Sequence, residues 1–274
     1  MGIGKPYCRL WRPLKGYESL SLSWQEDQPV ASIDYLEDNR FVGQAEMESL
    51  VTTAHLIIRD LYEVFNYIEP CDSNQHVYSH RIYELFLRTA TEFESNCKGI
   101  LRDNNYAKAE KDMNILDYYK IAPAVKLQDY KVSFERWGTR RMFIPFAGWN
   151  QTAQAPLTWY QEYNHVKHNR YSNFSKANLE NLMNAVAGLL CILHAQIGEY
   201  MDRACFEGNG VTQSTQDEVV TNTFTIKAPT FTDAEQYEFI WDDIKGNPDA
   251  VQKYIFNSDR SRATENSGEV AVTS

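Results

Sequence analysis

The sequence of 274 residues lacks the long apolar run of a membrane protein. Its longest uninterrupted apolar stretch, Ala185 to Leu193, is nine residues, whereas a membrane-spanning helix needs about twenty. The opening residues, MGIGKPY, contain no apolar region of the kind that a secretory signal requires. We therefore expect no membrane segment and a cytoplasmic protein.

Cysteine patterns of secreted or zinc-binding domains are also missing. The five cysteines are odd in number and widely spaced, with no C-x-x-C pair, at Cys8, Cys71, Cys97, Cys191 and Cys205. A disulfide framework or a zinc ribbon needs closely repeated pairs. The pattern predicts reduced thiols, and two of them, Cys97 and Cys191, fall within apolar helical patterns.

Basic charge is in deficit, since 27 Lys and Arg stand against 37 Asp and Glu for a net charge of −10. This balance argues against non-specific binding of duplex DNA, which needs surplus cations.

The sequence contains none of G-x-x-x-x-G-K-[ST], G-x-G-x-x-G, G-x-S-x-G, H-E-x-x-H or an EF-hand loop. We expect no cofactor.

Apolar residues instead recur at helical spacing, which predicts a mainly α protein. The segment Leu182 to Leu193 is apolar nearly all round, as in a helix buried in the middle of a bundle. We predict a bundle of four or more long helices. Helices are expected at 42–68, from the turn at 71–74 to about 102, at 113–119, from Pro156 to about His168 or Tyr171, and at 176–201 with Ser175 as its N-cap.

Alternating patterns predict a small amount of β structure. A β-hairpin insertion is expected at 130–146 around Gly138-Thr139, with further strands at 19–24, 31–35 and 219–227. The chain then divides into an irregular N-terminal arm at 1–40, the bundle with its hairpin at 41–205, a short mixed appendage at 206–256 and a disordered tail at 257–274.

One dense polar segment, residues 159–170, is the first candidate for chemistry. Asn164, Lys167 and His168 fall at i, i+3 and i+4, on one helix face. An imidazole with cationic neighbours can position a phosphodiester and move protons on it. The alternative is a polar helix end whose basic residues complement the helix dipole. His165 and His168 could share a metal ion, but no further ligand is identifiable, so we expect no metal.

Glu94 is the second candidate, because it lies beside the expected core stripe of its helix. It either pairs with Lys98 at i+4 or reaches across the bundle to His168, Lys167 or Arg170. Arg88 and Glu92 form a similar i+4 pair in the first case. The hairpin tip gathers Arg136, Arg140 and Arg141, which either contact nucleic acid or are simply solvated.

Two antiparallel helices followed by Tyr163-Asn164-His165-Val166-Lys167-His168 and a buried helix resemble the HEPN superfamily (higher eukaryotes and prokaryotes nucleotide-binding). The resemblance covers about residues 45–200. It implies a helical bundle that pairs as a homodimer and, in many members, acts as a metal-independent ribonuclease of defence or toxin–antitoxin systems. Asn164 and His168 match the family's motif, whereas Tyr163 stands where the family has Arg. Phe93-Glu94 and Lys98 resemble its accompanying polar positions.

We therefore expect a protein that binds or cleaves RNA or a nucleotide. The alternative is a non-enzymatic interaction or scaffold subunit, so catalysis stays open. Residues 136–170 contain five Lys and Arg against one acid, Glu162, which places any RNA there. The catalytic candidates are His168 as acid or base, Lys167 and Arg170 on phosphate oxygens, and Asn164 and Glu94 to orient them. The candidates for substrate binding are His165, Tyr163, Lys98, Arg140 and Arg141.

Overall fold

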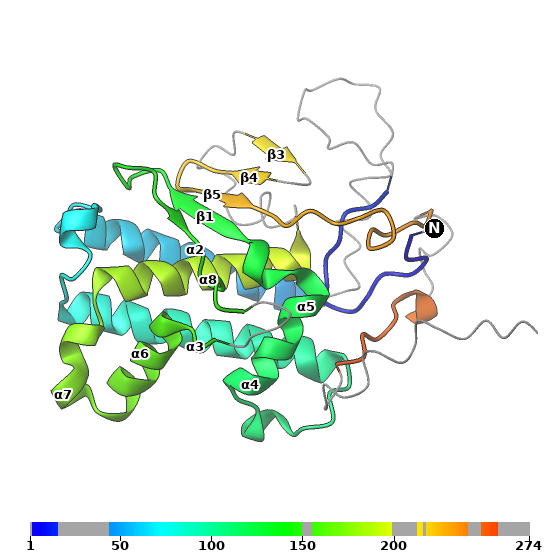
Figure 1. Ribbon diagram of the computed structural model, residues 1–274, viewed down its shortest axis with the longest axis horizontal. Coiled ribbons are helices and arrows are strands. Elements are labelled where there is room, and N and C mark those ends of the chain that lie inside the picture. Colours follow the sequence, from blue (N-terminus) through cyan, green and yellow to red (C-terminus); the bar gives the residue numbers. More distant parts are fainter. Residues whose placement is uncertain are drawn as a thin grey trace, which may run out of the picture.

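The computed structural model describes residues 2–15, 44–149, 155–198, 213–215, 218–240 and 248–256. It is mainly helical with a small antiparallel sheet (Figure 1), as predicted for the fold class. The predicted strands at 19–24 and 31–35 and the predicted tail at 257–274 lie outside the described residues.

The helices occur close to where the apolar periodicity predicts them. The predicted start of the last long helix is wrong, because its N-cap is Asn178 and not Ser175. The Asn178 side-chain oxygen accepts a hydrogen bond from Asn181 N at 3.0 Å. A 3-10 turn occupies residues 174–176 instead. The helices are α2 (Gln44–Phe65), α3 (His80–Asp103), α4 (Ile115–Tyr118), α5 (Ala122–Val125), α6 (Thr158–His168), α7 (Arg170–Asn173) and α8 (Leu179–Ile197).

Helix α8 lies at the centre of the bundle. It packs against α2, α3 and α6, and its side chains are buried along nearly the whole length. This confirms the burial that its apolar surface predicts. Gly188 lets α6 approach closely, because a Cβ there would lie 3.1 Å from the Trp159 ring.

The predicted hairpin is present but belongs to a larger sheet of order β2-β1-β5-β4-β3. Its first strand also pairs with β5, where Val132 lies opposite Ile226. The prediction of one strand at 219–227 is wrong, because Thr221 folds the chain into a turn by accepting hydrogen bonds from Thr223 N and Phe224 N. The strands are β1 (Lys131–Phe134), β2 (Met142–Phe143), β3 (Gln213–Thr215), β4 (Glu218–Val220) and β5 (Phe224–Lys227).

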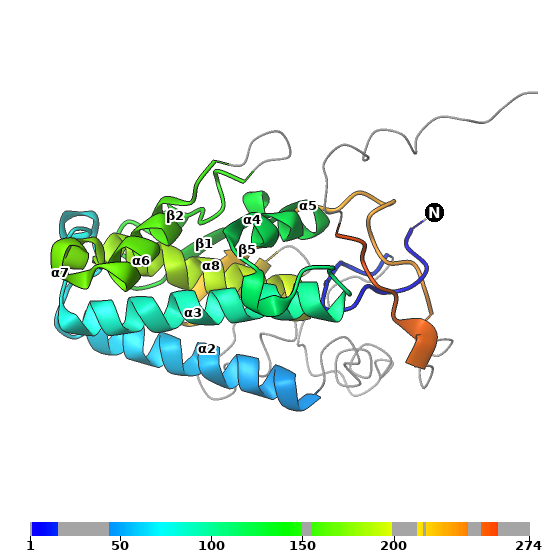
Figure 2. The ribbon, with the colours of Figure 1, turned by 90° about the horizontal axis from the view of Figure 1, so that it is seen from below.

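The described part of the N-terminal arm, residues 2–15, is irregular and packs against other segments of the chain. Isolated bridges pair Ile3 with Tyr237 and Tyr7 with Gln252. Trp11 N donates to the Ala195 carbonyl of α8 at 2.8 Å. Residues 2–15 thus lie beside the segments that contain Tyr237 and Gln252, at one end of the bundle (Figure 2).

Candidate functional site

Helices α3 and α6 run antiparallel and bring Glu94 to the polar segment. Successive contacts show the direction, since Phe86 meets Tyr163 while Phe93 meets Trp159. The Tyr160 hydroxyl donates to Glu94 Oε1 at 2.6 Å, and Lys167 Nζ lies 3.8 Å from Glu94 Oε2. We call Glu94, Tyr160, Tyr163 and Lys167 the α3–α6 cluster.

Lys167 is held in this cluster as a cation. Its Nζ donates to the Tyr163 hydroxyl at 3.0 Å and lies over the same ring. The bond to Tyr163 and the Glu94 carboxylate raise the pKa of Lys167, while burial raises that of Tyr160, which keeps its proton for Glu94. Glu94 is 14% exposed and Lys167 is 45% exposed. The Lys167 side chain is therefore partly open to solvent, while Tyr163 and Glu94 fix its direction.

Of the two alternatives for Glu94, the structure shows the contact across the bundle and not the i+4 pair. Lys98 is half-buried one turn along α3, and within the described part of the chain it forms no ion pair. The expected partner of Arg88 is also different, because Arg88 pairs with Asp60 of α2 at 2.5 Å and not with Glu92. Contacts between helices outcompete the local pairs here.

His168 lies next to Lys167 in the chain and is exposed. Its side chain forms no hydrogen bond or ion pair with any residue that the structure describes. Its imidazole is therefore open to solvent and to a ligand, not sealed against backbone carbonyls.

Arg170 does not join the α3–α6 cluster. Its Nη2 donates to His80 Nδ1 at 2.9 Å, and its guanidinium lies over the rings of Tyr83 and Phe174 at 5.0 and 5.2 Å. Tyr83 precedes Glu94 by eleven residues, which is about 16 Å along a helix. The structure thus separates these two predicted catalytic groups.

Asn164 and His165 make local contacts near the end of α6. Asn164 Nδ2 donates to the Tyr160 carbonyl one turn back at 3.1 Å. Lys176 Nζ donates to His165 Nδ1 at 3.0 Å and pairs with Glu162 at 2.9 Å. These bonds tie the helix end to the following 3-10 turn.

The two arginines of the hairpin differ from each other. Arg141 forms a two-point pair with Glu180 at the start of α8, with Nη1 and Nη2 at 2.8 and 2.6 Å. Arg140 is 79% exposed and lies 3.7 Å from Glu135. Within the described residues, neither arginine contacts the α3–α6 cluster.

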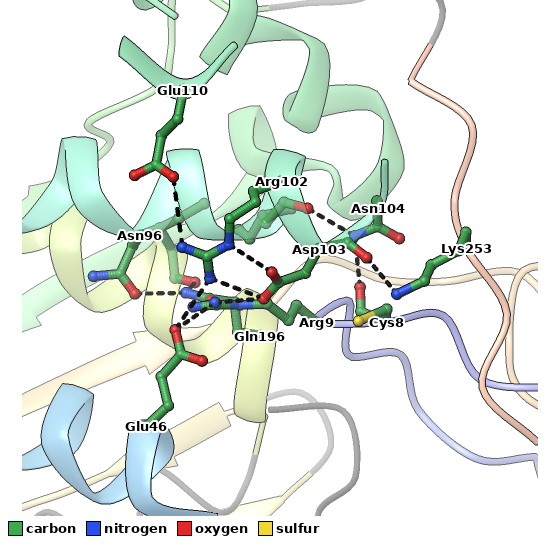
Figure 3. A network of polar contacts seen from close by, with 12 residues as sticks. Cys8, Arg9, Glu46, Asn96, Arg102, Asp103, Asn104, Glu110, Gln196 and Lys253 are labelled. Atoms are coloured by element: carbon green, nitrogen blue, oxygen red, sulfur yellow. Dashed lines mark hydrogen bonds and ion pairs between the residues drawn. The ribbon is translucent and has the colours of Figure 1, made fainter. Parts of the chain in front are cut away.

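Sequence reasoning missed a second polar network, which is buried around Arg9 (Figure 3). Arg9 is 1% exposed, and its Nη1 contacts Glu46 at 2.7 Å and Asp103 at 2.9 Å. Its Nε and Nη2 donate to Gln196, which donates in turn to Asn96. A buried charge needs such complete partnering. The network joins the N-terminal arm to α2, α3 and α8.

The buried histidine His194 and the buried thiols of Cys97 and Cys191 belong to neither the α3–α6 cluster nor the Arg9 network. His194 is fully buried, and burial lowers its pKa to about 3, so the ring is neutral. Its Nδ1 shares a hydrogen bond with the Tyr130 hydroxyl at 3.0 Å. Cys97 and Cys191 are free and buried, as predicted, and burial raises the pKa of both thiols. A raised pKa leaves them unreactive.

The described residues contain neither a candidate membrane span nor a candidate metal cluster. No helix there is both long and apolar enough to cross a membrane. Across the same ranges, no three His, Cys, Asp or Glu side chains gather where they could share a metal ion. Comparison with protein-family models, with curated proteins and with solved structures gave no match.

Proposed function

We propose that this protein binds RNA or a nucleotide through phosphate at the exposed edge of the α3–α6 cluster. The observation that carries the proposal is a partly exposed Lys167 side chain held by Tyr163, followed directly by an exposed His168 whose imidazole has no partner among the described residues. A cation attracts the phosphate, and the adjacent imidazole can exchange a proton with it. The helical bundle and this segment support a HEPN-like protein, acting in a defence or toxin–antitoxin module.

Cleavage is the catalytic form of the same proposal. His168 would take the proton from a ribose 2′-hydroxyl or return one to the leaving oxygen, while Lys167 holds a phosphate oxygen. Tyr163 accepts a hydrogen bond from Lys167. Tyr163 stands at the position of the family's Arg, so the Lys167 ammonium would have to replace a guanidinium that can donate two parallel hydrogen bonds to phosphate. We therefore expect slower cleavage than in a protein with the complete motif. No step requires a metal.

Binding is tested by fluorescence anisotropy with a labelled RNA strand over a range of salt concentrations. Lys167→Ala should weaken binding and reduce the slope of log K against log salt by about 0.7, the value for one phosphate on a single strand. Lys111→Ala, an exposed lysine in the 3-10 turn at Glu110–Asp112, is the matched control. Equal affinities of the two variants, or no binding by the wild type, would contradict the proposal.

Cleavage is tested separately in EDTA with the same RNA. His168→Ala should abolish cleavage while binding is retained, and His76→Ala, another exposed histidine, should leave it intact. RNA binding with no cleavage by the wild type would leave a binding protein and exclude the nuclease. Absence of both would favour the interaction subunit.

A further inference from the structure

The end of the bundle that carries α7 displays aromatic rings beside a fixed cation. We call Tyr78, His80, Tyr83, Arg170, Tyr171 and Phe174 the α7 platform. Phe174 contacts three of the other rings, at 5.6 Å from Tyr78, 4.8 Å from His80 and 5.8 Å from Tyr83. Figures 1 and 2 both show α7 at this end, beside the start of α3.

Two tyrosines of the platform face solvent. Tyr171 is 98% exposed and Tyr78 is 49% exposed. Nothing in the described chain covers the Tyr171 ring, so both of its faces are open. A large ring left entirely in water is available for a stacking partner.

The surroundings of Tyr171 are cationic, although the chain as a whole carries −10. The exposed Arg170 precedes it, and Lys167 and His168 lie within four residues on the same chain segment. The two acids nearest to Tyr171 in sequence are already paired, since Glu162 meets Lys176 at 2.9 Å and Glu180 meets Arg141 at 2.6 Å. Glu84, which follows Tyr83 of the platform, lies 3.8 Å from Arg81. The surface therefore suits a ligand that has both flat rings and negative charge.

We propose that the α7 platform binds the unpaired bases of single-stranded RNA, with one base stacked on Tyr171 and the phosphates running along Arg170 and Lys167. This rests on the proposed function and names its substrate class. Every base has a flat face that an aromatic side chain can cover, whatever the sequence. The bases of a duplex are stacked on each other and cannot reach the ring.

Three ligands separate the base from the phosphate. These are a 12-nucleotide oligo(A) strand, an abasic ribose-phosphate strand of the same length, and a 12-base-pair RNA duplex. The wild type should bind oligo(A) most tightly. Tyr171→Ala should weaken oligo(A) binding at least about fivefold and leave the affinity for the abasic strand unchanged. Tyr171→Trp should restore it, and Tyr67→Ala, which removes another exposed tyrosine, should have no effect.

Each contrary result has a distinct meaning. Equal affinity for oligo(A) and the abasic strand, with both weakened by Lys167→Ala, would overturn stacking and keep phosphate binding. Binding of none of the three ligands would overturn both proposals. If Tyr171→Ala instead converts a dimer to a monomer in light scattering and leaves oligo(A) affinity unchanged, the platform is a protein contact and the stacking proposal is wrong.

Discussion

The guanidinium of Arg9 occupies the space that a side chain at position 99 would fill. A Cβ added to Gly99 would lie 2.5 Å from Arg9 Nη1 and 2.8 Å from Arg9 Cζ. Gly99 lies inside α3, where glycine is otherwise unfavourable. The close approach explains this glycine and shows that the N-terminal arm is built into the bundle.

Gly99→Ala should therefore destabilise the protein, although the same change in an ordinary helix stabilises it by about 0.5–1 kcal/mol. We expect a loss of about 2 kcal/mol in the free energy of unfolding, because the ion network must shift. Urea denaturation measures it, with Gly138→Ala as control, since nothing lies within 4 Å of a Cβ there. In an Arg9→Ala background the penalty should shrink; a penalty that is the same in both backgrounds refutes the steric explanation.

His194 should make stability fall on mild acidification. Its pKa is lowered to about 3 by burial, against 6.5 when unfolded. Below pH 6.5 the unfolded state therefore binds a proton that the folded state refuses, and stability declines until about pH 3. Between pH 7 and pH 5 the loss should be about 2 kcal/mol.

The matched measurement compares the wild type with His194→Gln, whose amide can still form a hydrogen bond with Tyr130 but does not titrate. Denaturant curves at pH 7 and pH 5 should differ less in this variant, whereas His76→Gln, an exposed histidine, should behave as wild type. An unchanged pH dependence in His194→Gln would show that other groups cause the decline.

Arg140 and Arg141 should differ in how much each contributes to the free energy of unfolding. Arg141→Ala removes the two-point pair with Glu180 that joins the sheet to α8, and we expect a loss of about 1–2 kcal/mol. Arg140→Ala should change the unfolding free energy by under about 0.5 kcal/mol, because its side chain is mostly exposed. Thermal and urea denaturation check both, and equal losses would argue against the assigned role of Arg141.

Glu94→Gln should tighten RNA binding about threefold, since the carboxylate competes with phosphate for Lys167. Glu92→Gln, two residues away on α3 and half-buried, is the control and should leave affinity unchanged. Anisotropy at constant salt measures both, with melting temperatures recorded to exclude unfolding. Weaker binding by Glu94→Gln would show that the carboxylate orients Lys167 for the ligand and does not compete.

Local pattern was enough to predict the helices and the central position of α8. Burial periodicity depends only on neighbouring residues, so Phe93 and Cys97 could be placed in the core. The prediction of a single strand at 219–227 failed because the turn within it lacks the usual local signal. The turn in that segment has no glycine or proline, and the Thr221 side chain supplies the hydrogen bonds instead.

The site was predictable only in part. Glu94 could be assigned to the bundle side of α3, but its partner depended on how α6 lies along α3. The antiparallel register brings Lys167 to Glu94 and sends Arg170 towards His80. Residues three apart in sequence thus end in different surroundings.

The sequence by itself determined the helical class, the buried helix, the core thiols and the polar segment, because each follows from the order of neighbouring residues. Only the tertiary structure decided the pairing of β1 with β5, the burial of Arg9 and the division between Lys167 and Arg170. These contacts join segments distant in the chain. Packing and the need to neutralise buried charge decide which segments meet. Neither requirement produces a periodic pattern of residues in the sequence.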